Sequence, residues 1–415
     1  MSDGRWIASL CIARVGFSLI FVAYSASLGL LKQEWGLSSA QAGLIQSAWH
    51  AGYLVSLFAI GFLADRYGAK RTYLATSIAA CASGLAFALC ADGFLSALLL
   101  HGLAGLCSGG SYTPGLTLVS ERFAPMRRGR VMGYYLAAGS LGYALSLWMS
   151  SLLVVTTGWR MALVACALGP VAASLVSAWV LRDTRNVLHP AGQSNPLRAL
   201  GDVWRNKPAM LAVWAYVCHS WELLGMWAWL PTYLGVVFAY GREGGAGAAG
   251  LGIAFAALSY FISMAGSIGG GILSDRWGRT AVILLMSLAS LVCSFTFGWL
   301  IAAPVWIVVV VAIAYNLTSI GDSSVYSTAL TELVPAHCLG AAWALRSVLG
   351  FGAGAISPWV FGLVLDLGQG APGTREAAAW GWAWTALGLG ALLGPLATLR
   401  LRAMRESAQM AGGKR

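Results

Sequence analysis

Long apolar stretches separated by short polar segments make up most of this chain. Twelve of them are long enough to cross a bilayer, which takes about 20 residues as a helix. We predict spans at residues 6–30, 41–63, 72–91, 95–119, 130–155, 160–181, 209–237, 250–273, 281–301, 305–329, 339–365 and 378–400. Their apolar character does not alternate from residue to residue, so we expect helices rather than barrel strands. The predicted fold class is an all-α membrane protein with twelve transmembrane helices.

Composition supports this interpretation. Hydrophobic residues are 58% of the chain, charged residues are 10%, and the mean hydropathy is +0.73. Soluble domains carry about 25% charged residues, so this chain lacks the polar surface of a soluble protein. The first apolar stretch is too long for a secretory signal and no small-residue cleavage site follows it. We therefore interpret it as the first span, and we expect the lipid bilayer to be the main partner.

The distribution of basic residues predicts the orientation. The chain has 26 lysine and arginine residues and a net charge of +11, and most of them follow the even-numbered spans or lie near the two termini. Cytoplasmic loops carry such an excess, so we predict both termini in the cytoplasm of a bacterial-type inner membrane. The positive charge is scattered over separate loops, and we expect no nucleic-acid partner.

An internal repeat divides the chain into halves. The segment after span two reads GFLADRYGAKR (residues 61–71), and the segment after span eight reads GILSDRWGR (residues 271–279). Other residues repeat at nearly the same sequence separation as the two motif copies: Glu121 corresponds to Glu332 and Gly139 to Gly350. We predict a six-helix bundle at 1–181, a cytoplasmic linker at 182–208 with a solvated basic face, and a second six-helix bundle at 209–415 with a short tail. Such repeats are typical of secondary transporters, and a complete two-bundle fold is expected to work as a monomer.

The two G-x-L-x-D-R-x-G motifs, one after span two and one after span eight of a twelve-span chain, resemble the signature of the major facilitator superfamily. The segment Gly158-Trp159-Arg160 at the start of span six fits the same resemblance. The resemblance implies two pseudo-symmetric six-helix bundles and a gate near the motifs. It implies gating roles for Asp65, Arg66, Gly68, Arg71, Glu121, Asp275, Arg276 and Gly278. The alternative is that these charges only end each helix at the membrane interface.

Charged residues inside spans are costly and mark functional sites. In the resembled fold, spans one, four, seven and ten line the cavity. Arg14 in span one is the candidate for binding a substrate anion, because guanidinium matches carboxylate geometry and keeps its charge when buried. A snorkelling arginine is the alternative.

Three further buried groups are candidates for proton coupling: His219 and Glu222 in span seven and Asp322 in span ten. A structural ion pair, for example between Asp322 and Arg346, is the alternative. For His50 and His101 we expect hydrogen-bonded packing.

Aromatic and amide side chains of the same spans complete the predicted substrate site. Together with Arg14, its members are Trp49, Tyr53, Tyr112, Trp221, Trp227, Tyr315 and Asn316. Most of the 19 tryptophans are expected at the membrane interfaces. The eight cysteines contain no CxxC pair, so we expect neither disulfides nor a metal site, and we expect no cofactor.

The function predicted first is proton-coupled transport of a small organic anion of the carboxylate type by alternating access. The alternative keeps the fold and predicts proton-driven efflux of an amphipathic or cationic compound, attracted by Glu222 and Asp322. The resembled antiporters often carry Gly-Pro in span five, where this chain has Gly142-Tyr143, which weakens the alternative. No nucleophile elbow, metal-ligand motif or phosphate loop is present, so we do not expect an enzyme.

Overall fold

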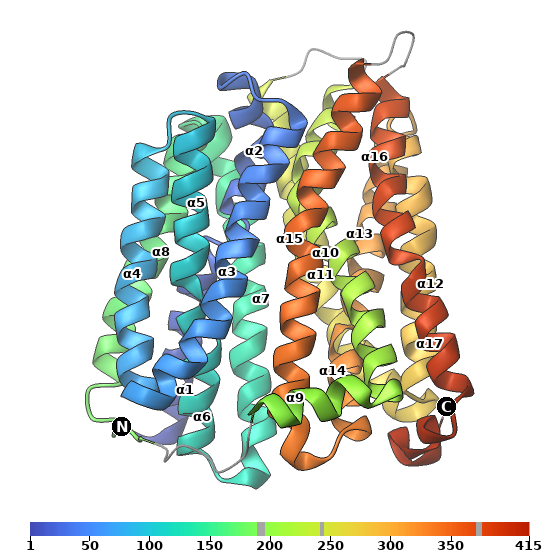
Figure 1. The fold of residues 1–415 in the computed structure, drawn as a ribbon. Helices are drawn as coiled ribbons and strands as arrows, with labels where there is room; N and C mark the ends of the chain where they lie inside the picture. Colours follow the sequence, from blue (N-terminus) through green and yellow to red (C-terminus); the bar gives the residue numbers. More distant parts are fainter. Residues whose placement is uncertain (189–195, 241–244, 371–375, 415) are drawn as a thin grey trace. The chain divides into compact units, whose positions relative to one another are not determined.

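The computed structural model describes residues 1–188, 196–240, 245–370 and 376–414, and within these ranges the chain is helical with no strand (Figure 1). Twelve helical segments in the described residues are long and apolar enough to cross a membrane. Each coincides with one of the predicted spans and extends it by a few residues at most ends. The predicted fold class is therefore confirmed.

The helices of residues 1–180 form the first six spans. In chain order they are α1 (Asp3–Ser18), α2 (Ala23–Glu34), α3 (Ser39–Tyr67), α4 (Ala69–Cys90), α5 (Phe94–Ser108), η1 (Gly109–Ser111), α6 (Thr113–Arg122), α7 (Pro125–Thr156) and α8 (Trp159–Val180).

The remaining helices form the last six spans, a linker helix and the tail. They are α9 (Pro196–Arg205), α10 (Lys207–Ala239), α11 (Ala246–Trp277), α12 (Arg279–Phe297), η2 (Gly298–Leu300), α13 (Val305–Gly321), α14 (Ser323–Leu333), η3 (Ala336–Cys338), α15 (Leu339–Gly370), α16 (Glu376–Ala391), α17 (Leu393–Ala403) and η4 (Arg405–Gly413).

Two compact units emerge from the packing of these helices. Unit 1 consists of Met1–Leu37, Leu44–Gly192 and Leu234–Ala257, and unit 2 consists of Ser38–Gly43, Gln193–Tyr233 and Leu258–Arg415. The predicted bundles at 1–181 and 209–415 remain a prediction, since each unit also includes short helix ends from the other half of the sequence. The predicted linker contains a helix that sequence analysis missed, α9, and its residues 189–195 lie outside the described residues.

Three spans that carry candidate polar residues are broken along their length. Span one is interrupted between α1 and α2 at residues 19–22, span four by the 3₁₀ turn η1, and span ten at Asp322 between α13 and α14. A broken helix frees backbone groups, and membrane proteins tolerate this only where protein or a polar cavity satisfies them. The breaks therefore identify the parts of each unit where polar chemistry is concentrated.

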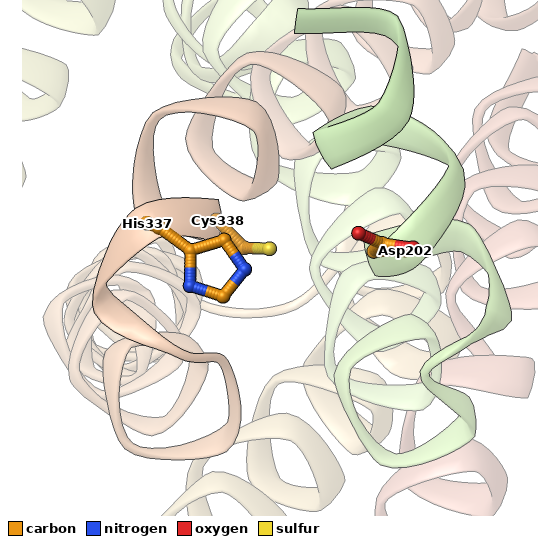
Figure 2. Close-up of side chains that lie close together, drawn as sticks. All are labelled: Asp202, His337 and Cys338. Atoms are coloured by element: carbon orange, nitrogen blue, oxygen red, sulfur yellow. The ribbon is translucent and has the colours of Figure 1, made fainter. Parts of the chain in front are cut away.

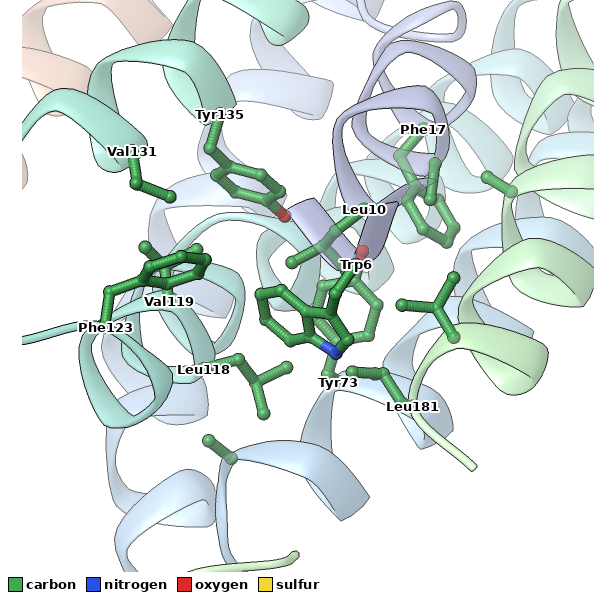
Figure 3. Close-up of a cluster of buried hydrophobic side chains, with 14 residues drawn as sticks. Trp6, Leu10, Phe17, Tyr73, Leu118, Val119, Phe123, Val131, Tyr135 and Leu181 are labelled. Atoms are coloured by element: carbon green, nitrogen blue, oxygen red, sulfur yellow. The ribbon is translucent and has the colours of Figure 1, made fainter. Parts of the chain in front are cut away.

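The core of unit 1 is an aromatic and aliphatic cluster near the N-terminus (Figure 3). Trp6, Leu10 and Phe17 recur on one face of α1, and they pack against Tyr73 of α4 and Tyr135 of α7. The spacing of the α1 residues is that of a single helical face. This packing holds α1 in place and thereby positions Arg14, which lies one turn from both Leu10 and Phe17.

Candidate functional site

Arg14 is buried inside unit 1, with only 5% of its surface exposed. Its Nη1 donates a 2.6 Å hydrogen bond to Ser111 Oγ in η1, while Nε has no hydrogen-bond partner. The guanidinium carbon lies 5.6 Å from the ring centre of Tyr112 and 5.7 Å from that of Tyr135. No carboxylate among the described residues pairs with it. The side chain is turned into the unit rather than toward the membrane interface, which contradicts the snorkelling alternative.

Small residues around Arg14 make room for it. A Cβ added at Gly139 of α7 would lie 3.1 Å from Arg14 Nε, a tight contact that glycine avoids. The break in span four serves the same purpose, because η1 turns Ser111 toward Arg14 and leaves its carbonyl to accept a hydrogen bond from the Tyr135 hydroxyl. Arg14 therefore has polar and aromatic neighbours that offer hydrogen bonds but no compensating negative charge.

Two of the predicted aromatic residues form one cluster in unit 1. Trp49 and Tyr53 of α3 stack with ring centres 5.0 Å apart, and Phe21 packs edge-on against Trp49 at 4.5 Å. The same helix carries a pair that sequence analysis did not connect: Gln46 Nε2 lies 3.2 Å from His50 Nε2. His50 therefore has the hydrogen-bonded packing role expected for it.

In unit 2, Asn316 and Tyr315 of α13 take part in a hydrogen-bonded network. Trp227 Nε1 donates to Asn316 Oδ1 at 3.1 Å, and Asn316 Nδ2 donates to Ser259 Oγ at 2.9 Å. The Tyr315 hydroxyl donates to Ser294 Oγ at 2.9 Å. These hydrogen bonds connect buried polar groups of four helices, α10, α11, α12 and α13. Asn316 is consequently a positioning group for Trp227 as well as a candidate substrate contact.

Glu222 of α10 is buried in unit 2 and is 4% exposed. Its Oε2 accepts a 3.0 Å hydrogen bond from Ser290 Oγ of α12, and its Oε1 has no hydrogen-bond partner. No basic group pairs with Glu222 within the described part of the chain. A carboxylate in such surroundings is costly to bury unless it binds a proton or a cation.

His219 and Asp322 come together inside unit 2. His219 Nδ1 lies 2.9 Å from Asp322 Oδ1, and the two side chains are 4% and 2% exposed. The rings of Tyr216 and Tyr326 pack around the imidazole, each 5.4 Å away between ring centres. Sequence analysis named both residues but paired Asp322 with Arg346 in its alternative. That pairing is wrong, because the break after α13 turns Asp322 toward α10.

Arg346 of α15 has different neighbours. Its Nη1 donates to Ser327 Oγ, and its guanidinium carbon lies 4.2 Å from the ring centre of Tyr216. Trp221, predicted to line a cavity, packs its indole nitrogen closely against Gly390 of α16. Trp221 therefore fills space between two helices, and its predicted contact with substrate stays a prediction.

At the first motif, the helices α3 and α4 are joined by Gly68 alone. Gly68 has φ +87°, a value that glycine adopts easily, and an added Cβ would lie 2.3 Å from Asn186 Oδ1. Lys70 Nζ donates to the carbonyls of Arg182 (3.0 Å) and Thr184 (2.8 Å). The partners of Lys70 are thus backbone carbonyls beyond α8. Arg66 lies 5.3 Å from the ring centre of Tyr67.

At the second motif, Gly278 has φ +96° and joins α11 to α12 in the same way. Arg279, which was not among the predicted gate residues, is the centre of a charged cluster. Its Nη2 lies 2.9 Å from Glu332 Oε1, and its Nη1 contacts Asp275 and donates to Ser274 Oγ at 2.7 Å. The gating roles of Asp65, Arg71, Glu121, Asp275 and Arg276 stay predictions.

Sequence reasoning missed several members of these sites. Ser290 and Ser294 lie one turn apart on α12 and contact Glu222 and Tyr315, respectively. Polar residues at helical spacing in an otherwise apolar span are a signal that could have identified them. Ser111 carried no comparable signal, because only the break in span four brings it to Arg14.

Comparison with known proteins decides the family. The sequence profile described as the Major Facilitator Superfamily matches residues 8–358. The chain belongs to this superfamily. It is an integral membrane protein, and its described residues contain twelve candidate spans.

Two curated relatives and one solved structure agree with this assignment. The probable sulfoacetate transporter SauU of Cupriavidus necator is 24% identical, and the match covers 84% of this chain and 85% of the relative. The hexuronate transporter of Bacillus subtilis is 24% identical, with 83% of each chain covered. The crystal structure of a bacterial homologue of the human lysosomal transporter Spinster has a TM-score of 0.77 at 14% identity, covering 98% of this chain and 99% of that one. This structural likeness supports the superfamily fold.

Proposed function

We propose that this protein is a secondary active transporter that moves a small organic anion of the carboxylate type across the inner membrane by alternating access, coupled to protons. The observation that carries the proposal is Arg14, a buried guanidinium that donates a hydrogen bond to Ser111 and has an unpartnered Nε and no carboxylate partner among the described residues. A buried cation without a counter-ion is strongly unfavourable. A substrate carboxylate that hydrogen-bonds to the guanidinium would supply the missing charge.

The relatives support the same substrate class. The substrates after which the two curated relatives are named, sulfoacetate and hexuronate, are organic anions. At 24% identity the individual substrate of this chain is not expected to be the same. We propose the shared chemistry, a small molecule with at least one carboxylate, as its substrate.

The His219–Asp322 pair and Glu222 are the proposed proton carriers. His219 Nδ1 and Asp322 Oδ1 lie 2.9 Å apart inside unit 2, and ionisable groups buried in the spans of transporters mark proton relays. Glu222 adds a second buried carboxylate with a free oxygen, and Tyr216, Tyr326 and Arg346 are the other ionisable groups nearest the pair. Loading one proton with each anion would lower the charge that crosses the membrane.

The proposed orientation has both termini in the cytoplasm, as the distribution of basic residues predicts. In this orientation the two motif turns, which follow spans two and eight, also lie on the cytoplasmic side. We propose a monomer as the working unit, because the described part of one chain contains twelve candidate spans.

The test is uptake into proteoliposomes of purified protein under an imposed inward proton gradient, with a panel of radiolabelled uronates, sulfocarboxylates and other carboxylates. For any transported anion we expect Arg14→Gln to raise the half-saturating concentration roughly 10- to 100-fold, the loss of one charged hydrogen-bonded contact. Arg5→Gln is the matched control, because Arg5 is an exposed arginine on the same helix. Equal losses in the two variants, or uptake unchanged in Arg14→Gln, would contradict an anion site at Arg14.

One observation favours the alternative function, proton-driven efflux of a cationic compound. Glu222 is a buried carboxylate without a basic partner in the described residues, and such a group attracts a cation as well as a proton. The same vesicles distinguish the two functions. Efflux of a cationic dye that is lost in Glu222→Gln and unaffected by Arg14→Gln, with no carboxylate uptake, would establish the alternative.

A further inference from the structure

Three side chains with metal-binding chemistry meet in unit 2, one of them far along the sequence from the other two. They are Asp202 of the linker helix α9 and His337 and Cys338 of the 3₁₀ turn η3, and their ligand atoms all lie within 4.8 Å of one another. Figure 2 shows the Cys338 sulfur projecting toward Asp202, with the His337 imidazole beside it. Sequence analysis expected no metal site, because the eight cysteines contain no CxxC pair.

The local packing holds these three residues in place. Val203 and Cys338 both belong to one buried hydrophobic cluster of unit 2 and are 1% and 2% exposed. Because Val203 is buried, the preceding residue of α9, Asp202, lies at the exposed edge of the cluster, where His337 is exposed as well. α9 also packs against α15, so the distance between the helix and the turn is set by apolar contacts rather than by the polar residues themselves.

No other group competes for the three side chains in the part of the chain that the structure describes. None of them donates or accepts a side-chain hydrogen bond there, and neither Asp202 nor His337 forms an ion pair. A surface aspartate beside a histidine is ordinarily explained as an ion pair, but the arrangement here adds a nearly buried thiol directed at the same point. Three potential ligands that converge without hydrogen-bonding to one another have the arrangement of a metal site.

We propose that Asp202, His337 and Cys338 bind one transition-metal ion of the Zn²⁺ type. Thiolate, imidazole and carboxylate are the ligands that Zn²⁺ prefers, whereas Ca²⁺ and Mg²⁺ prefer sets made only of oxygen. Zinc–ligand bonds of about 2.0–2.3 Å in a tetrahedron place ligand atoms roughly 3.3–3.8 Å apart. Separations of up to 4.8 Å require the side chains to close by about 1 Å, which rotamer adjustment of two exposed residues allows.

Binding releases the thiol proton of Cys338 to solvent and forms three metal–ligand bonds. The fourth position stays open to water or to an external ligand. The metal would fasten the linker helix α9 to the turn that joins spans ten and eleven. This function is separate from substrate transport, and its test does not depend on which substrate is moved.

The test is titration of the purified full-length protein, with any affinity tag removed, by ZnCl₂ in competition with a zinc-sensitive dye. We expect one ion per chain. We expect Cys338→Ser, His337→Ala and Asp202→Asn each to weaken binding at least tenfold, since each removes one of only three protein ligands. Cys90→Ser and Glu406→Gln are matched controls, because they remove an exposed cysteine and an exposed carboxylate outside the cluster, and both should bind as the unaltered protein does.

Cobalt provides a second measurement that identifies the ligand type. Co²⁺ bound through Cys338 should give a thiolate-to-cobalt absorption band in the near ultraviolet that is absent in Cys338→Ser and present in Cys90→Ser. His337→Ala and Asp202→Asn alter exposed side chains and should fold, so they test the site even if Cys338→Ser unfolds. Stoichiometric binding that survives in both of these variants, or the absence of any binding above that of the dye, would overturn the proposal.

Discussion

The two copies of the G-x-L-x-D-R-x-G motif have the same turn but are held by different partners. In both copies a glycine with φ near +90° connects the helices, Gly68 in unit 1 and Gly278 in unit 2. Around Gly68, Lys70 donates hydrogen bonds to two backbone carbonyls, and the side-chain amide of Asn186 donates one to the carbonyl of Tyr67. Around Gly278 they are the ion pairs of Arg279 with Asp275 and Glu332.

The difference teaches which part of the repeat is shared. The backbone conformation at the glycine is common to both copies, as only glycine adopts it without strain. The contacts are not shared: Arg279 stands where the first copy has Ala69. The C-terminal tail adds to the second copy only, because Ala411 N donates to Glu332 Oε2 at 3.1 Å and Lys414 Nζ donates to the carbonyl of Asp275 at 2.7 Å. The two copies thus share the glycine turn and differ in the side chains that stabilise it.

The largest effect is expected at Arg279. Arg279→Met should lower the free energy of unfolding by about 3 kcal/mol, because it removes a side chain that is 9% exposed and takes away the arginine that Glu332 and Asp275 pair with. Unfolding in mixed detergent micelles measures this change. Arg276→Met is the control: Arg276 is exposed on the same turn, and its replacement should change stability by less than about 0.5 kcal/mol. Similar losses in both variants would show that the ion pairs do not hold this turn.

Arg279 also shows what the sequence could and could not predict. Span positions follow from apolar length alone, so all twelve were predictable, and buried charges such as Arg14, Glu222 and Asp322 are conspicuous in apolar spans. The partners of these buried side chains were not predictable, because they depend on helix breaks and rotations that leave no local signal in the sequence. The break at Asp322 brings it to His219, and the packing of α9 brings Asp202 to Cys338. Residue types were thus predictable where partners were not.

A second test separates the shared turn from its local contacts. Gly68→Ala should cost about 2 kcal/mol, from the positive φ and from displacement of Asn186, whose Oδ1 would lie 2.3 Å from the new Cβ. In an Asn186→Ala background the added cost of Gly68→Ala should fall to about 1 kcal/mol, since only the backbone strain remains. Gly278→Ala is the comparison at the second copy, with its φ of +96°. A cost of Gly68→Ala that is the same with and without Asn186 would mean that the side chain moves away freely.

The smallest effect is expected at Lys70. Lys70→Met removes two hydrogen bonds to the carbonyls of Arg182 and Thr184 at a half-buried position, where water can still reach the carbonyls, so the loss should be about 0.5 kcal/mol. Because the partners are carbonyl dipoles and not carboxylates, this loss should change little between 0.05 and 0.5 M NaCl. The loss at Arg279→Met should shrink over the same range, since salt screens its partly exposed carboxylates. Unfolding of both variants at the two salt concentrations checks this contrast, and a salt dependence at Lys70 equal to that at Arg279 would show that the first turn, too, is held by charge.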